Sequence, residues 1–141
     1  MSEVRESHVD VEVRYAETDQ MGVVHHSVYA VWFEIARTEL CSQTGYHYAD
    51  IEKMGYNLVV TALSSRHVKP AHYGDTVRVS CTIDRLFSRG VHFAYRVHHG
   101  ETLLAEGRSE HIWLAAATKR PCRAPEALRR PFDRLAGQDQ D

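Results

Sequence analysis

The segment from Ser27 to Thr44 constrains the fold more than any other part of the chain. Apolar side chains cover most of its first three helical turns, which predicts a largely buried helix rather than one lying on a surface. These side chains are Val28, Tyr29, Val31, Trp32, Phe33, Ile35, Ala36 and Leu40. Ser27 can cap the start of the helix, and Gly45 can end it in the left-handed conformation. At about 1.5 Å per residue it would run ~27 Å, which is enough to cross a small domain.

Period-two patterns predict strands on both sides of this helix. Residues 8–15 alternate strictly, as a half-buried strand does, and their apolar face carries Val9, Val11, Val13 and Tyr15. Behind the helix we expect a short second helix at 49–54 and strands near 58–63, 77–83, 91–97 and 103–115. Residues 88–90 join two of these strands as a hairpin, and Pro125 opens a last short helix before a frayed end. The pattern predicts an α+β class in which one mostly antiparallel sheet wraps around one helix.

The length of 141 residues fits a single domain, with a core at about residues 8–127. Charge is uneven along it: residues 1–65 hold 4 Lys/Arg and 10 Asp/Glu, whereas residues 66–134 hold 13 and 7. The basic half can be an uneven solvated surface or can meet a polyanionic ligand. Nucleic acid is disfavoured, because the basic residues are scattered and no basic run with interleaved aromatics occurs.

The sequence also bears on the compartment. No apolar run approaches the ~18 residues of a membrane-spanning helix, and the charged start has no apolar core of a secretory signal. The three cysteines are an odd number, are widely spaced and form no CxxC pair. They favour a reducing compartment, so we expect a cytoplasmic protein without a transmembrane segment.

Several catalytic chemistries are disfavoured by the residues. The ten histidines include the adjacent pairs at 25–26 and 98–99, but none sits in a helical His-x-x-x-His pattern and no cysteine cluster completes a tetrahedral set, so no metal is expected. No Gly-x-Ser-x-Gly elbow supports a serine nucleophile. Cys41 and Cys81 fall on predicted buried faces without an activating neighbour.

Asp19 stands out because it lies in a turn between a strand and the buried helix. An Asp in an Asp-x-x-Gly turn is most often structural, since its side chain bonds the backbone of the turn. The alternative is a working carboxylate next to a helix N-terminus, where free N–H groups and the positive dipole end suit a developing negative charge.

Four segments together resemble the 4-hydroxybenzoyl-CoA thioesterase family, and most closely its broad acyl-CoA thioesterase branch, which is associated in bacteria with the Tol-Pal operon. They are residues 13–26, VRYAETDQMGVVHH, with 29–39, 70–75 and 120–125. The resemblance covers about residues 8–127. It implies a hotdog fold, an antiparallel sheet wrapped around the long helix. It also implies homodimers with active sites at the subunit interface, often paired into homotetramers.

The resemblance implies an acyl-CoA thioesterase that releases CoA and a free carboxylic acid. The catalytic carboxylate falls on Asp19, as base or nucleophile, and the oxyanion donor is the backbone N–H of His26, whose side chain is then replaceable. Gly22 lets the chain turn closely around the acyl group. His25 can orient Asp19 or touch the thioester carbonyl, or be a partly buried histidine with no such role. CoA is part of the substrate, and no cofactor is expected.

The remaining substrate-binding candidates are Tyr15, Glu34, Val60 and Thr61, with Lys69, Arg89, Lys119, Arg120 and Arg123 for the CoA phosphates. Each basic residue can equally be a plain surface charge. Glu34 can pair with Arg37 or Thr38 one turn away, or face the site across the dimer interface. The strand before the Pro turn has Arg66-His67 where the family often carries Arg-Tyr.

Two rival functions remain open. A hotdog protein can hold acyl thioesters or lipids without turnover, although the presence of Asp19 argues against this. Hotdog dehydratases resemble a different motif with a histidine deeper in the central helix, and residues 27–44 contain none.

Overall fold

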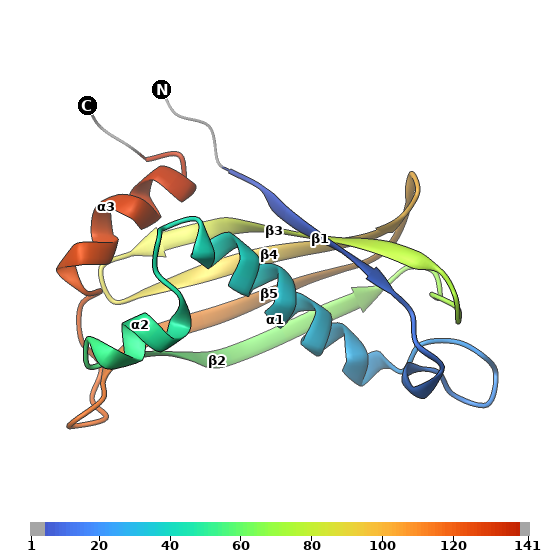
Figure 1. Ribbon diagram of the computed structural model, residues 1–141, viewed down its shortest axis with the longest axis horizontal. Helices are drawn as coiled ribbons and strands as arrows, with labels where there is room; N and C mark the ends of the chain where they lie inside the picture. The colour runs from blue at the N-terminus through green and yellow to red at the C-terminus, as the bar shows by residue number, and fades with distance from the viewer. Residues whose placement is uncertain (1–4, 139–141) are drawn as a thin grey trace.

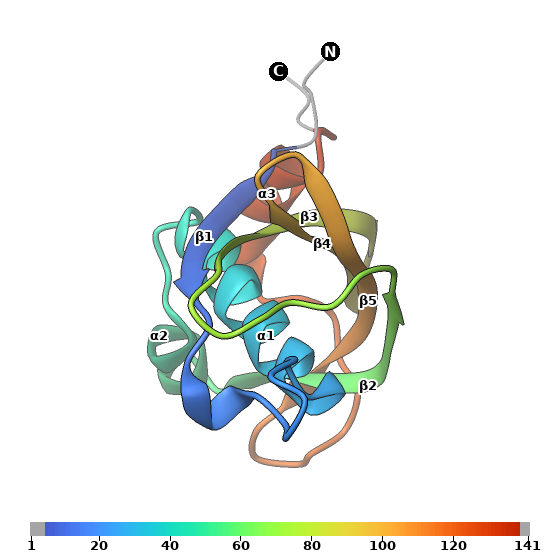
Figure 2. The same cartoon turned by 90° about the vertical axis from the view of Figure 1, so that its right-hand side faces the viewer.

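A curved antiparallel sheet of five strands holds the long helix α1 against its inner face, as the end-on view in Figure 2 shows. The computed structural model describes residues 5–138. Its elements in chain order are β1 (Ser7–Glu12), the 3-10 turn η1 (Tyr15–Glu17), α1 (His26–Ser42), α2 (Tyr48–Lys53), β2 (Tyr56–His67), β3 (Thr76–Phe87), β4 (Gly90–His99), β5 (Thr102–Ala115) and α3 (Glu126–Leu135).

The strand order is β1-β3-β4-β5-β2, with every neighbouring pair antiparallel, so β1 and β2 are the two edges (Figure 1). The α+β class and the sheet wrapped around one helix, the hotdog arrangement, are confirmed. The hairpin at residues 88–90 joins β3 to β4 as expected. β2, β3 and β4 are each longer than the alternation predicted.

The core lies between α1 and the inner face of the sheet. On α1 the fully buried side chains include Trp32, Phe33, Ala36 and Leu40, which face alternate residues of β3 and β4. Burial of apolar area of this kind is the main stabilising term, at roughly 25 cal/mol per Å². α3 adds Leu128, Phe132 and Leu135, so the core extends past residue 127.

Two predictions about α1 are wrong. It begins at His26 with His25 as N-cap residue and no side-chain cap, so Ser27 lies inside the first turn instead of capping it. Its burial is also less complete than expected for a largely buried helix, because Val31 is 52% and Ile35 is 42% exposed. Gly45 has φ +88°, the left-handed conformation expected after the helix, although α1 itself ends at Ser42.

The first strand is shorter than its sequence pattern. β1 ends at Glu12, because Val13 leaves β3 and exchanges backbone hydrogen bonds with the turn at Gly74 and Asp75. The chain then tightens into η1, and Tyr15 is 75% exposed instead of lying on the buried face.

Close packing of the sheet on α1 depends on Gly107 of β5. A Cβ atom at this position would lie 2.3 Å from Cε2 of Phe33. The Phe33 ring is itself stacked on Tyr95, with the centroids 4.5 Å apart, so it has little room to move. The helix can therefore sit this close to β5 only because residue 107 has no side chain.

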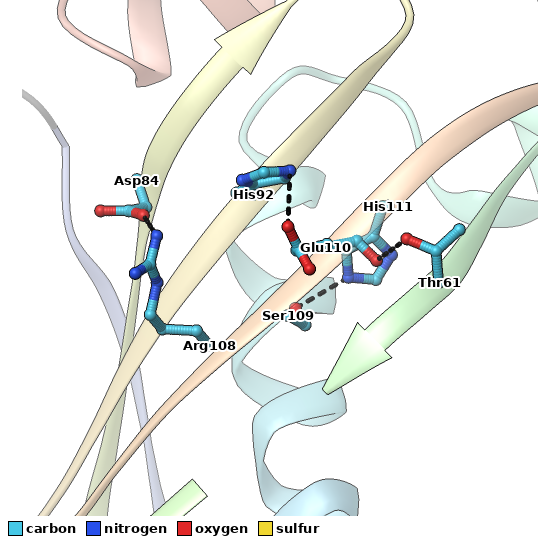
Figure 3. A network of polar contacts seen from close by, with 7 residues as sticks. All are labelled: Thr61, Asp84, His92, Arg108, Ser109, Glu110 and His111. Carbon is cyan, nitrogen blue, oxygen red and sulfur yellow. Dashed lines mark hydrogen bonds and ion pairs between the residues drawn. The ribbon is translucent and has the colours of Figure 1, made fainter. Parts of the chain in front are cut away.

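A chain of buried polar groups crosses this core. Arg37 of α1 donates from Nη1 to the hydroxyl of Tyr95 at 2.9 Å, and Tyr95 shares a hydrogen bond with Ser109. Ser109 also contacts Nε2 of His111 at 2.8 Å. Figure 3 shows Ser109 and His111 on β5, where they alternate with the outward-facing Arg108 and Glu110. Because these inner side chains form hydrogen bonds with one another, their polar atoms are buried without losing their hydrogen-bond partners.

The buried histidine of this network should make stability depend on pH. Desolvation, followed by the charge of Arg37 and by His92, lowers the pKa of His111 from 6.5 to about 3. Between these values the unfolded chain binds a proton that the folded chain does not, so the free energy of unfolding falls as pH falls below about 6.5. The loss is at most about 1.4 kcal/mol per pH unit.

Urea unfolding at pH 7.5, 6.5 and 5.5, at one protein concentration, measures this effect. We expect His111→Gln to flatten the decline below pH 6.5, whereas His8→Gln, at an exposed histidine of β1, should keep the wild-type slope. Parallel pH curves for wild type and His111→Gln would contradict the assignment.

Candidate active site

The loop before α1 fixes Asp19 through its own backbone and one side-chain oxygen. Oδ1 accepts hydrogen bonds from the N–H groups of Met21 (2.8 Å) and Val23 (3.3 Å). The loop also closes through Asp19 N–H to Val23 O and Gly22 N–H to Asp19 O, with Gly22 at φ +78°. Asp19 is therefore a turn former, but only through Oδ1; within residues 5–138 nothing forms a hydrogen bond or ion pair with Oδ2.

This loop is tied to the rest of the molecule at two places. Val24 N–H donates to Ala71 O at 2.9 Å, which joins it to the Pro turn, and His25 N–H donates to Glu17 O at 3.0 Å. Glu17 itself is buried, and its Oε2 accepts a hydrogen bond from the indole of Trp32 in α1. Glu17 belongs to the sequence motif at residues 13–26. No periodic pattern in the sequence indicates that its side chain holds the loop against α1.

A pocket of about 420 Å³ opens over the start of α1. Its lining residues are Asp19, Val24, His25, His26, Tyr29, His67, Val68, Lys69 and Pro70. It brings Lys69, predicted to bind a CoA phosphate, together with Asp19, His25 and His26, which the motif at residues 13–26 contains. Gly22 shapes the loop without lining the pocket. His67 and Tyr29 were not identified as site residues.

The N-terminus of α1 supplies a donor to this pocket. His26 is the first helical residue, and in the described part of the chain its N–H has no hydrogen-bond partner. Such a group, at the positive end of the helix dipole, can bind an oxygen that becomes negative. A carboxylate and an oxyanion donor thus border one cavity, an arrangement suited to attack on a carbonyl carbon.

Other predicted substrate residues lie away from this pocket. Tyr15 packs against Tyr73, with the ring centroids 5.7 Å apart, on the outside of the loop. Glu34 and Val60 line a second pocket, of about 390 Å³, between α1 and the first half of β2. Thr61 donates its hydroxyl to Glu110 O at 3.1 Å.

The expected partner of Glu34 within its own helix is wrong. Arg37 turns inward to Tyr95 and Tyr48, at 2.9 and 3.2 Å, and no ion pair of Glu34 occurs among residues 5–138. Glu34 is exposed, on the same side of α1 as the second pocket.

Four of the five basic candidates lie at the opposite end of the sheet from Asp19. Arg89 sits in the β3–β4 hairpin, and Lys119, Arg120 and Arg123 lie in the segment between β5 and α3. Ala115 pairs with Tyr56 at the beginning of β2, whereas His67 at its other end lines the Asp19 pocket. At about 3.3 Å per residue, β2 separates the two ends by roughly 35 Å.

Other chemistries find little support in the described region. Among residues 5–138 no group of three or more His, Cys, Asp or Glu side chains is arranged to hold a metal ion. Burial raises the pKa of the Cys41 thiol to about 11 and that of Cys81 well above its usual value, so both thiols are poor nucleophiles at neutral pH. None of the helices between residues 5 and 138 has the length and apolar character needed to cross a bilayer.

Comparison with known proteins places this geometry in context. The family model described as the thioesterase-like superfamily matches residues 13–132. A putative acyl-CoA thioesterase of Bacillus subtilis is 37% identical over 121 residues, which are 84% of this chain and 87% of that protein.

Two solved structures are also close. A hypothetical protein from Thermus thermophilus is 41% identical, with a TM-score of 0.87, over 92% of this chain and 98% of that one. A DHNA-CoA thioesterase from Staphylococcus aureus is 35% identical, with a TM-score of 0.80, over 84% of this chain and 80% of that one.

Proposed function

Because the chain belongs to the thioesterase-like superfamily and is a thioester hydrolase, we propose that it hydrolyses acyl-CoA through Asp19, with the N–H of His26 as oxyanion donor. The observation that carries this proposal is the free Oδ2 of Asp19 in the pocket at the start of α1. We further propose that the enzyme is part of the 4-hydroxybenzoyl-CoA thioesterase branch, acts in the cytoplasm and needs no cofactor.

The hydrogen bonds that Oδ1 accepts within the turn fix the orientation of the carboxylate. Oδ2 is then available to react. Oδ2 either takes a proton from a water that attacks the thioester carbon or attacks that carbon itself. In both routes the carbonyl oxygen becomes negative and is stabilised by the N–H of His26. His25, which precedes it, is placed to orient Asp19 or the carbonyl.

The decisive experiment measures thiol release from a panel of aliphatic and aromatic acyl-CoAs. Steady release from at least one of them, with the free acid as second product, supports the enzyme. Stoichiometric binding of acyl-CoA or lipid without release would favour the non-catalytic binding protein instead. Single-turnover reaction in ¹⁸O-water then separates the two routes, since only the nucleophile route places label in Asp19.

The acyl-CoA site, we further propose, is completed by a second copy of the chain. β2 is a 12-residue edge strand without a neighbour on its outer side. Val60 and Leu63 on β2 are 50% and 48% exposed, and Val31 and Ile35 of α1 are exposed as well. A long apolar edge of this kind is a template for pairing with another strand.

Antiparallel pairing of two β2 strands about a twofold axis reverses one subunit relative to the other. It would bring the basic end of the partner to the Asp19 pocket. This explains how Arg89, Lys119, Arg120 and Arg123 can meet CoA phosphates although they lie far from Asp19 in their own chain. Two such dimers can form the expected homotetramer.

Mixing two defective variants tests this arrangement. One chain carries Asp19→Asn, and the other carries Gln at Arg89, Lys119, Arg120 and Arg123. After co-refolding, half of the dimers are mixed and each has one intact site, so about a quarter of wild-type activity should return at substrate below KM. If no activity returns, Asp19 and the basic residues must serve the same site from one chain. A 16.1 kDa monomer in sedimentation would exclude a site shared between two chains.

A further inference from the structure

His67 reaches the Asp19 pocket from the far end of β2. Its imidazole packs edge-on against the ring of Tyr29, with the centroids 4.6 Å apart. Tyr29 is buried in α1, one turn beyond His26. The imidazole therefore lies beside the start of the helix, in the lining of the same pocket as Asp19.

One nitrogen of this ring is held by its own strand. Nε2 lies 3.1 Å from the hydroxyl of Ser65, two residues earlier on the same face of β2. When the imidazole is protonated both nitrogens are donors, so Ser65 accepts from Nε2 and the proton on Nδ1 remains available. Ser65 thus acts as a positioning residue that fixes which nitrogen serves the pocket.

The pocket around His67 is lined by both acidic and basic side chains. Asp19 is the carboxylate of the pocket, and His25, His26 and Lys69 are its other titratable or cationic groups. Burial raises the pKa of Tyr29, which therefore stays neutral. Arg66 next along the strand pairs with Glu106 on the outer side of the sheet, at 3.8 Å.

We propose that His67 is the proton donor to the leaving thiol, an assignment that rests on the proposed thioester hydrolysis. When the tetrahedral intermediate collapses, the carbon–sulfur bond breaks and its electron pair goes to sulfur. Nδ1 of the imidazolium gives its proton to that sulfur, so a neutral thiol leaves and a neutral imidazole remains. The proton that Asp19 took from the attacking water returns to His67 through solvent. Acid and base thus line one pocket.

A change of leaving group tests this role. The substrates are the best acyl-CoA of the panel and the 4-nitrothiophenyl ester of the same acid, whose thiolate leaves without protonation. His67→Gln keeps a hydrogen-bond donor but cannot transfer a proton. We expect it to lower kcat for acyl-CoA by about 10²-fold, near the low end for general acids, and to change the activated ester by less than about threefold.

Matched variants and the pH profile complete the test. His8→Asn, on the exposed side of β1, should behave as wild type, and Lys69→Met should keep the wild-type dependence on leaving group. A general acid must be protonated to act, so the wild-type kcat for acyl-CoA should have a limb that falls as pH rises, and His67→Gln should lose that limb.

Each other outcome overturns a distinct claim. Equal loss on both thioesters, or no loss on either, removes His67 as the acid while leaving the hydrolase intact. If the wild-type chain releases thiol from neither substrate, the proposed function and this assignment fall together.

Discussion

Replacing Asp19 by asparagine should lower kcat for acyl-CoA by about 10²–10⁴-fold, the range typical for loss of a general base. Asparagine keeps a carbonyl oxygen that can accept the hydrogen bonds from Met21 and Val23, so the turn survives. What disappears is the charge on the atom that faces the pocket. The loss belongs to the transition state, and KM should change little.

Asp19→Ala is the matched comparison, because it removes both the charge and the turn. It should lower the unfolding free energy as well as kcat, whereas Asp19→Asn should leave stability within about 0.5 kcal/mol of wild type. The two variants separate the structural role of Oδ1 from the chemical role of Oδ2. A folded Asp19→Asn chain that turns over at a near-normal rate would refute the mechanism.

The second large effect concerns packing. Gly107→Ala should lower the free energy of unfolding by about 3 kcal/mol, the upper part of the usual range for an overpacked core. The new methyl group would press on the Phe33 ring, which is already stacked on Tyr95. Without this clash the change would stabilise the strand, since glycine is unfavourable there by roughly 0.5–1 kcal/mol relative to alanine.

A double-mutant cycle identifies the clash as the cause. In a Phe33→Leu background the same substitution should cost at least about 1 kcal/mol less, because the smaller side chain leaves room for the methyl group. Glu106→Ala, at the next position on the outer face, should stay within about 0.5 kcal/mol. Urea unfolding at a single protein concentration measures the four chains of the cycle and the Glu106→Ala control. An additive cycle would show that Phe33 is not the obstacle.

Local patterns predicted the fold well where side chains and backbone agree. The alternation in β3 and β4 and the apolar turns of α1 follow directly from burial against one core. The prediction that Tyr15 lies on a buried strand face was wrong. Apolar and polar residues still alternate there, although the backbone leaves the sheet after Glu12. That departure is set by hydrogen bonds from Val13 to a turn 60 residues later, which no local pattern contains.

The site could be predicted only in part. Asp19, His25 and His26 are neighbours in the chain, so one motif could indicate all three. Glu17 contacts α1 through Trp32, and His67 meets the pocket from a strand some 40 residues later; both contacts are products of the tertiary fold. The basic half was visible as a charge imbalance, but the position of Arg89, Lys119, Arg120 and Arg123 at the end of the sheet opposite Asp19 was not.

The irregular pairing of β2 with β5 bears on how this chain avoids aggregation. The register shifts between Val60 and Ala62, where one extra residue of the edge strand β2 interrupts its ladder with β5. Such a bulge bends and twists a strand, so an arbitrary flat strand cannot add along its whole length. The β2 strand of a second copy of this chain carries the same bend, so the two strands can follow each other. In the β2-to-β2 dimer proposed above, the interruption at Thr61 would let a second copy of the chain pair with this strand while hindering open-ended growth of the sheet.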